Sequence, residues 1–467
     1  MEDTNFGAAI WSYDWQGLQQ DESCPQGTAN LSDDSVVLNL PFDQLLAGGA
    51  TSDFEATYPD NADFLYGFTQ DGYYLSLTDA TQYRTSTHIP GGIEQTIHGR
   101  YLLASHKTFD PTSNIEHAAI RFHHLRNWVA KSPFITEMTT NPLRFSAIKY
   151  DKDNKDKYDL LLLDDNQVTA RLRHIIGIPS NGVGDITISH DVVIDLEFKQ
   201  TTKLRDLVGK ALSLGRFLSF CLGFYAELKE LQCITESSDS IIRVYGTFPK
   251  AKPQGSSRLA SIPFKLTDIE DTIGTHMSKW LNAPNLLKES SSIIVSLMAN
   301  NWDMPFNLNI IAASQALEAL SKLDTDTKSL DDAQYERYRT VVLSGVSDHK
   351  IREWAGNKLN SNRKGQKKLL QEMIERYSAY LAWLVGDGKA FVKEHVNSRN
   401  SFIHIGNTEQ DKEGWEREYW HYRATIFVCY LVICANLGIP AEKVLNRLHT
   451  SSFENYAISK VRKIYAS

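Results

Sequence analysis

The sequence predicts an α+β protein in which a β-rich, sandwich-like N-terminal domain precedes an all-α helical bundle. Short strand-like runs, separated by Asp, Asn, Gly and Pro clusters, fill the chain to about residue 200, whereas apolar residues at helical spacing dominate from about residue 265. Between them, residues 249–257 combine Pro, Gly, Ser and Lys without periodicity. We therefore expect domains at 1–250 and 265–467, joined by a linker at 251–264.

The N-terminal part has runs of β-favouring residues, with turn signals at Pro90-Gly91-Gly92 and Ser180-Asn181-Gly182. Many short strands at this spacing favour a sandwich-like or partly open β domain, while the first 35 residues show no clear pattern. One helix, 202–229, interrupts the strands and is expected to pack on the sheet. The expected strands are 35–40, 97–103, 143–150, 160–163, 192–198 and 241–248.

The C-terminal part is predicted to be helical almost throughout. Pro305 suits the first turn of a helix, and Gly438 with Pro440 forms a stop signal. Because the connections are short, the helices should form an antiparallel bundle. The expected helices are 267–280, 285–299, 305–323, 331–343, 348–359, 367–384, 390–403 and 415–437.

Composition indicates a folded globular protein, with 42% hydrophobic and 23% charged residues. The net charge of −8 is unevenly spread. Residues 1–100 carry 15 Asp and Glu against 2 Lys and Arg, whereas residues 301–467 have a net charge of about +3 by the same count. A nucleic-acid site is therefore permitted in the C-terminal part, although this is not a strongly basic footprint.

The chain is expected to be cytoplasmic, with no membrane partner. Its five cysteines are odd in number and lack CxxC or zinc-ligand spacing, which is typical of core cysteines in a reducing compartment. The acidic start Met1-Glu2-Asp3-Thr4 does not resemble a secretory signal. The apolar run 426–435 is too short to span a bilayer, which needs about 20 residues. It is expected to be a buried helix.

Three histidines, His117, His123 and His124, suggest a metal site, but the alternation around Ala119, Ile120, Phe122 and Leu125 offers no third acidic or thiol ligand. A metal is therefore the weaker hypothesis. The sequence has no GxxxxGK[ST], HExxH or GxSxG motif, so NTPase, zincin and serine-hydrolase functions lack support.

The segment Arg399-Asn400-Ser401-Phe402-Ile403-His404 carries the most chemistry. Histidine has an unperturbed pKa of about 6.5 and can transfer protons, while arginine presents a planar cationic fork to phosphate oxygens. His404 and Arg399 could thus promote attack of a ribose 2′-hydroxyl on the adjacent phosphate, with no metal and no cofactor. Asn400 would orient either group and is the weaker assignment.

Helix geometry separates this pair. Five residues turn a helix by about 500°, so Arg399 and His404 cannot share one narrow stripe. They must converge from a helix end or meet across two chains. Around a twofold axis, two arginines and two histidines could surround one phosphate.

The arrangement Arg399-Asn400, three residues, His404 matches the R-x4-6-H signature of the HEPN superfamily. Two further segments, 216–223 (RFLSFCLG) and 315–320 (QALEAL), resemble ApeA-like anti-phage proteins within that superfamily. The resemblance implies a β-rich sensing domain before a HEPN domain, and a toxic metal-independent endoribonuclease that acts in abortive infection. It also implies homodimers or higher homo-oligomers through HEPN domains, a phage-derived trigger at the N-terminal domain, and structured RNA such as tRNA as substrate.

Alternatives stay open. Arg399 and His404 could merely interact with a helix C-terminus and solvent, and some HEPN domains only bind; the competing function is a non-catalytic RNA- or protein-binding regulatory dimer. Glu318 could hold His404 or Arg399, or face solvent. The basic run Arg363, Lys364, Lys367 and Lys368 could follow an RNA backbone, although a solvated loop and helix start is favoured.

Overall fold

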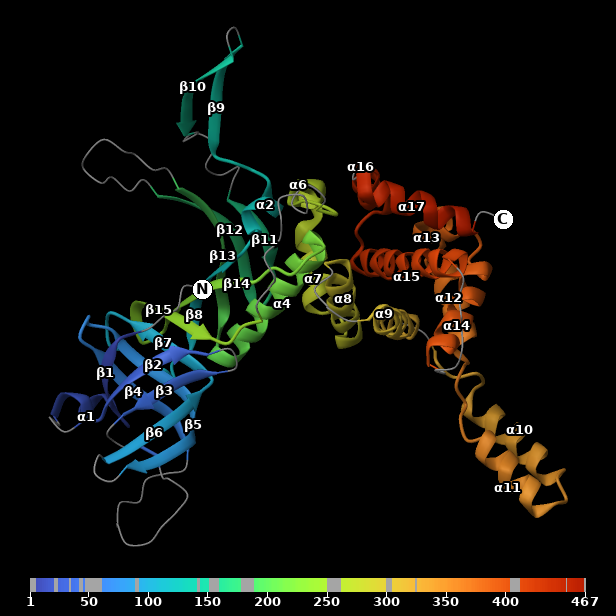
Figure 1. The fold of residues 1–467 in the computed structure, drawn as a ribbon, viewed down its shortest axis with the longest axis horizontal. Coiled ribbons are helices and arrows are strands. Elements are labelled where there is room, and N and C mark those ends of the chain that lie inside the picture. Colours follow the sequence, from blue (N-terminus) through green and yellow to red (C-terminus); the bar gives the residue numbers. More distant parts are fainter. Residues whose placement is uncertain are drawn as a thin grey trace. The chain divides into compact units, whose positions relative to one another are not determined.

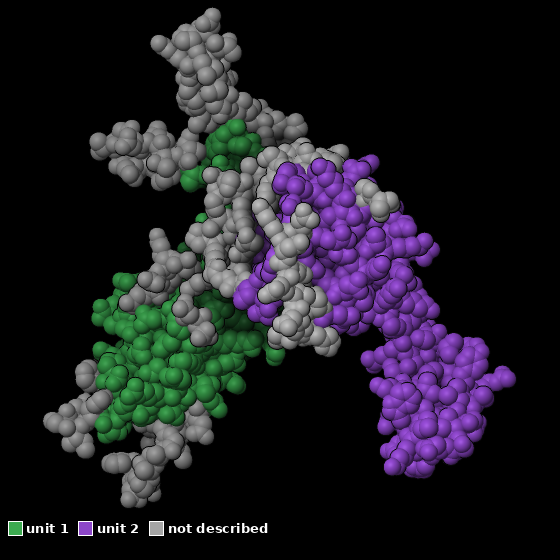
Figure 2. All heavy atoms as spheres, turned by 45° about the vertical axis from the view of Figure 1, so that its right-hand side comes forward, with its two compact units in different colours: residues 1–218, 226–253, 271–278 green, residues 219–225, 254–270, 279–467 purple. Residues whose placement is uncertain are grey.

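The structure, a computed structural model, divides into two compact units, shown in green and purple in Figure 2. Unit 1 comprises residues 1–218, 226–253 and 271–278, and unit 2 comprises 219–225, 254–270 and 279–467. Most of the expected linker and the turn signals at Pro90-Gly91 and Ser180-Asn181-Gly182 lie outside the described residues. The residues described are 6–20, 24–32, 35–41, 45–46, 61–88, 92–140, 143–150, 159–177, 189–249, 262–299, 305–323, 326–403, 412–450 and 452–465.

Six strands of unit 1 close into a barrel, in the order β5-β4-β1-β2-β3-β6 and back to β5 (Figure 1). Closure depends on the length of β5, whose first half pairs with β4 and β7 (Tyr101–Ser105) and whose second half pairs with β6. Between the halves Asp79 has a φ of 49°, a conformation that Asp tolerates better than most residues. The six strands are β1 (Ala8–Ser12), β2 (Gln26–Leu31), β3 (Val36–Leu40), β4 (Asn61–Thr69), β5 (Tyr74–His88) and β6 (Gly92–Gly99).

Beyond β7 the sheet continues through six more antiparallel strands. The helix α4 (Leu204–Leu222) packs against this sheet, and its Gly215 is required because a Cβ there would lie 2.8 Å from the ring of Phe122 on β8. In sheet order the added strands are β15 (Ser238–Gly246), β14 (Leu228–Thr235), β8 (Ile115–Phe122), β13 (Ser189–Thr202), β12 (Val168–Gly177) and β11 (Leu160–Asp164). Also present are α1 (Trp15–Gln20), α2 (Leu125–Val129) and a separate β9 (Phe134–Thr140) and β10 (Leu143–Tyr150) hairpin.

The predicted β-rich N-terminal part is confirmed, and its form is a barrel with further strands rather than two stacked sheets. Two local predictions were wrong. The helix expected over 202–229 ends at Leu222, because Gly223 adopts a φ of 72° and the chain then enters β14. The strand expected over 97–103 is interrupted at Arg100, between β6 and β7.

The helical C-terminal part is also confirmed. Its central helix is α15 (Lys412–Leu437), in which every residue from Trp420 to Cys434 is buried. A helix that is apolar all round must be covered on all sides, and α15 packs against α8, α9, α13, α14, α16 and α17. Of the helices that the structure describes, none has the length and apolar character to cross a membrane.

The remaining helices follow the prediction closely up to residue 437, with two exceptions. The helix expected over 267–280 is divided by a 3-10 turn at 270–272, and the one expected over 367–384 breaks at Tyr377. They are α6 (Leu266–Ile269), the 3-10 turn η2 (Glu270–Thr272), α7 (Ile273–Leu281), α8 (Asn285–Met298), α9 (Phe306–Ser321), α10 (Asp332–Ser344), α11 (His349–Lys358), α12 (Gln366–Arg376), α13 (Ser378–Val385), α14 (Lys389–Ile403), α16 (Ala441–Thr450) and α17 (Ser452–Tyr465). The last two were not predicted.

Candidate functional site

Arg399 lies near the C-terminal end of α14, with about a third of its side chain exposed. Its Nη2 is 3.5 Å from Oε2 of Glu318 on α9, a residue 81 positions earlier in the chain. The other oxygen of Glu318 accepts a hydrogen bond from Lys322 Nζ at 3.2 Å. The structure therefore brings Arg399 and Glu318 together. Asn400, the next residue of α14, is exposed, while His404 directly follows α14 and lies outside the described residues.

A buried histidine lies one helical turn before Arg399. His395 is 1% exposed, and burial, reinforced by the positive charge of Arg399, lowers its pKa to about 4, although Glu318 opposes the shift. Among the described residues its Nε2 has no hydrogen-bond partner. The imidazole is thus neutral at neutral pH. It adds no positive charge beside Arg399.

The rings around His395 form a second layer of this site. His421 on α15 lies 5.6 Å from His395 between ring centroids, and Phe391 packs against both. Burial, followed by the charges of His395 and Arg417, lowers the pKa of His421 to about 3. Its Nδ1 is hydrogen-bonded to the Tyr465 hydroxyl on α17. His395, one helical turn before Arg399, is thus neutral and held in place by the surrounding rings.

Two polar contacts fix α14 against α15 on either side of this layer. Ser398 donates to Glu418 at 2.7 Å, and burial raises the pKa of that carboxyl group. Arg417 donates two hydrogen bonds to Glu394, at 2.7 and 3.1 Å. Sequence reasoning missed these supporting residues. His395 could have been found, because it precedes Arg399 by four positions and such residues share a helix face.

The basic run lies where the chain enters α12. Lys364 is half-buried and paired with Glu372 at 2.8 Å, whereas Arg363, Lys367 and Lys368 are exposed. Lys367 and Lys368 occupy the first turn of α12, where the helix dipole does not favour cations. Three of the four basic side chains are therefore open to an anion, and both interpretations of the run remain.

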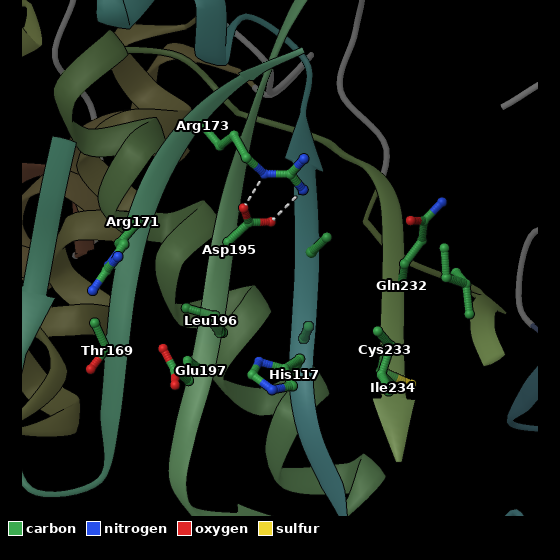
Figure 3. Close-up of a pocket in the computed structure, with 13 residues that line it drawn as sticks. His117, Thr169, Arg171, Arg173, Asp195, Leu196, Glu197, Gln232, Cys233 and Ile234 are labelled. Atoms are coloured by element: carbon green, nitrogen blue, oxygen red, sulfur yellow. Dashed lines mark hydrogen bonds and ion pairs between the residues drawn. The ribbon is translucent and has the colours of Figure 1, made fainter. Parts of the chain in front are cut away.

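Unit 1 contains a separate pocket of about 410 Å³ on one face of the sheet (Figure 3). Its floor forms where Ala119, a short side chain, lies between its cross-strand neighbours Asp195 and Gln232. Glu197, His117 and Ile234 form the next row. In Figure 3 the arginine side chains of β12 flank one side and Gln232 the other. The lining residues are His117, Ala118, Ala119, Thr169, Arg171, Arg173, Asp195, Leu196, Glu197, Gln232, Cys233, Ile234 and Ile241.

The pocket carries charges of both signs. Arg173 donates two hydrogen bonds to Asp195, one of them from Nη2 at 3.1 Å, so these charges largely satisfy each other. Arg171 and Glu197 are exposed and oppositely charged. The lining contains no Phe, Tyr or Trp, and its one ring is that of His117. Such a pocket suits a ligand with apolar groups and charges of both signs better than a stacked base or an isolated phosphate.

The three candidate metal-ligating histidines do not converge. His117 lines the pocket, His123 is partly buried, and His124 has a φ of 66° at the start of α2. Burial lowers the pKa of His123. Within the described ranges, no group of three or more His, Cys, Asp or Glu side chains could hold a metal ion.

Comparison with protein families gives two matches. A profile described as ApeA N-terminal domain 1 matches residues 15–280, and one described as Apea-like HEPN matches residues 311–443. The second range contains Glu318, Arg399 and Asn400, together with both buried histidines. No match was found among curated proteins or among solved structures.

Proposed function

This chain belongs to the ApeA family, whose N-terminal domain 1 covers more than half of it, and on that premise we propose that it is a metal-independent endoribonuclease acting as a toxin in abortive anti-phage defence. The Apea-like HEPN domain indicates a nuclease of anti-phage defence. The cleavage chemistry, the catalytic residues and the RNA substrate are what we propose beyond this family membership.

In the proposed reaction the ribose 2′-oxygen attacks the adjacent phosphorus as the bond to the 5′-oxygen breaks. His404 transfers protons, and the leaving 5′-oxygen departs as a hydroxyl, so the products are a 2′,3′-cyclic phosphate and a 5′-hydroxyl. Arg399 stabilises the charge on the phosphoryl oxygens. Two HEPN domains pair about a twofold axis to complete the site, and structured RNA such as tRNA is the substrate.

The observation that supports this proposal is the single 3.5 Å contact of Arg399 with Glu318. At that length the contact is at the limit of a hydrogen bond, so it orients the guanidinium, and no other described residue occupies its remaining donors. Phosphate can then occupy them in a bidentate fashion. The exposed amide of Asn400 lies next to the same end of α14.

The test is RNA cleavage by the purified full chain in EDTA. We expect cleavage with 2′,3′-cyclic phosphate ends, and its loss in Arg399→Ala and in His404→Ala with unchanged thermal unfolding. A requirement for added divalent metal, or normal cleavage by His404→Ala, would contradict the mechanism. RNA that is bound but never cut, with any trigger, would instead favour the non-catalytic regulatory dimer.

We also propose that the phage-derived trigger binds the unit 1 pocket as an extended polypeptide segment. The apolar floor would take one side chain, and Arg171 and Glu197 would meet charges flanking it. Ala119→Trp should fill the floor and abolish protection against phage, with RNA cleavage by the purified protein unchanged. The control is Gln200→Trp, at an exposed position of β13 outside the pocket. Full protection by Ala119→Trp would contradict this assignment.

A further inference from the structure

The helices α10 and α11 form a hairpin that projects from the other helices of unit 2 (Figure 1). Neither helix contains a buried residue. Both nevertheless begin with a defined cap, since the Asp331 and Asp348 side chains accept hydrogen bonds from the backbone of Gln334 and Ile351. The hairpin is therefore a formed element without a core of its own.

The neck of the hairpin is fixed. Asn362 accepts from the backbone N–H of Leu330 at 3.1 Å and donates to its carbonyl at 2.7 Å. Lys328 and Arg363 form a β-bridge, and the Tyr335 hydroxyl donates to the carbonyl of Leu359. These contacts hold the two ends of the hairpin together.

One face of the hairpin is apolar and exposed. Val341 is 63% exposed and Trp354 is 61% exposed, and Tyr338, Val342 and Ile351 are each about half exposed. On α10 the stripe 338, 341, 342 lies about 110° from the line of half-buried residues 335, 339 and 343 that faces α11. On α11 the half-buried residues Ala355 and Leu359 form the line that faces α10. Ile351 and Trp354 are turned from this line by about the same angle and in the same rotational sense. Because the helices are antiparallel, both stripes open on the same side.

Such a face is unstable in water by itself. Helices shorter than about 12 to 15 residues are marginal in isolation, and a helix hairpin needs a partner layer to bury its apolar side. Two more helices complete a four-helix bundle, and a second copy of the same hairpin supplies them about a twofold axis.

Charge permits a second copy of the hairpin at this face and argues against nucleic acid. Residues 331–359 contain five acidic and five basic residues, so two hairpins can approach without net repulsion. A face for nucleic acid would be strongly basic. We propose that the α10–α11 hairpin pairs with the hairpin of a second copy of this chain through Tyr338, Val341, Val342, Ile351 and Trp354. This pairing rests on the HEPN dimer of the proposed function and adds a contact surface separate from the Arg399 corner, by which we mean Arg399, Asn400 and Glu318.

The test is cross-linking of the full chain between copies. Each variant carries one new cysteine, at Tyr338, Val341, Ile351 or Trp354, and is treated with a short bismaleimide. The background is Cys24→Ser, because the other described cysteines are buried. We expect covalent dimers from the apolar face. Thr340→Cys is the matched control, since Thr340 is also exposed but turned away from the face.

A second variant measures the association itself. Val341→Lys with Trp354→Lys should leave the circular dichroism spectrum of the chain unchanged, because neither residue is buried within one copy, and should weaken self-association at least tenfold in sedimentation. The proposal would be overturned by an absence of cross-links between copies, by equal cross-linking of Thr340→Cys, or by unchanged association of the double variant. Each of these results would leave a different protein as the partner of this face. RNA cleavage by the same samples is scored separately, so failure of the nuclease proposal would not be confused with failure of hairpin pairing.

Discussion

The pocket of unit 1 and the Arg399 corner of unit 2 both pair an arginine with a carboxylate, but in different ways. Arg173 engages Asp195 with two donors, whereas Arg399 reaches Glu318 through one contact of 3.5 Å. Glu318 is also shared with Lys322. A bidentate pair satisfies both partners and fixes geometry. Among the residues that the structure describes, Arg399 has only this one long contact, and on the proposed function its other donors bind the anionic substrate.

The largest expected effect separates these two arginines directly. Arg399→Ala should reduce RNA cleavage about 1000-fold, the scale of losing a donor to a developing oxyanion. Arg173→Ala should leave cleavage within twofold, because Arg173 serves the sheet. Cleavage rates of both variants on one RNA substrate check this, with circular dichroism as the folding control. Similar losses in both variants would remove the distinction.

Acid should destabilise the layer behind Arg399. The folded-state pKa values of His395 and His421 are about 4 and about 3, below the value of about 6.5 for an exposed histidine, so the unfolded chain binds more protons as the pH falls. Their contribution to stability is therefore full above pH 6.5 and is lost as the pH falls toward 4, by about 2 kcal/mol per histidine at pH 5.

Urea unfolding at pH 7 and pH 5 measures this loss. His395→Leu should show a smaller difference between the two pH values than the wild type, because it removes one of the two proton-binding groups. An unchanged difference would mean that His395 is not held neutral in the folded protein.

A smaller effect is expected from Glu318→Gln. This change keeps the shape of the side chain but removes the charge that orients Arg399, so kcat should fall about tenfold while KM changes little. Lys322→Ala is the control, since it leaves Glu318 and Arg399 in place. An increase in kcat for Glu318→Gln would show that Glu318 restrains Arg399 instead of positioning it.

The smallest effect is expected from Lys367→Ala with Lys368→Ala. We expect less than a twofold change in cleavage, because an exposed helix start is the favoured interpretation of this run. The salt dependence of RNA binding is the discriminating measurement. A loss above fivefold together with a shallower salt dependence would assign the run to RNA contacts.

Much of the helical architecture could be predicted from the sequence, because its signals are local. The expected helix 390–403 differs from α14 by one residue, since its apolar periodicity and flanking glycines are contiguous. The break at Tyr377 could not be predicted, because no glycine or proline marks it. Closure of the barrel through β5 depends on pairings between distant strands, which short-range patterns do not encode.

The candidate site was predictable only in part for the same reason. Arg399, Asn400 and His404 stand out as a local motif, but Glu318 is 81 residues from Arg399 and its contact depends on the packing of α9 against α14. His421 approaches His395 from another helix. Both contacts arise from tertiary packing and have no signature in the spacing of the motif.

The central claim is that the HEPN domain cuts RNA through Arg399 and His404. The most direct measurement is sequencing of RNA ends after induced expression of the wild type and of His404→Ala. The account predicts new ends with 2′,3′-cyclic phosphate and 5′-hydroxyl groups, gathered in structured RNA such as tRNA, in the wild type alone. The same ends in His404→Ala, or no new ends in a toxic wild type, would contradict it.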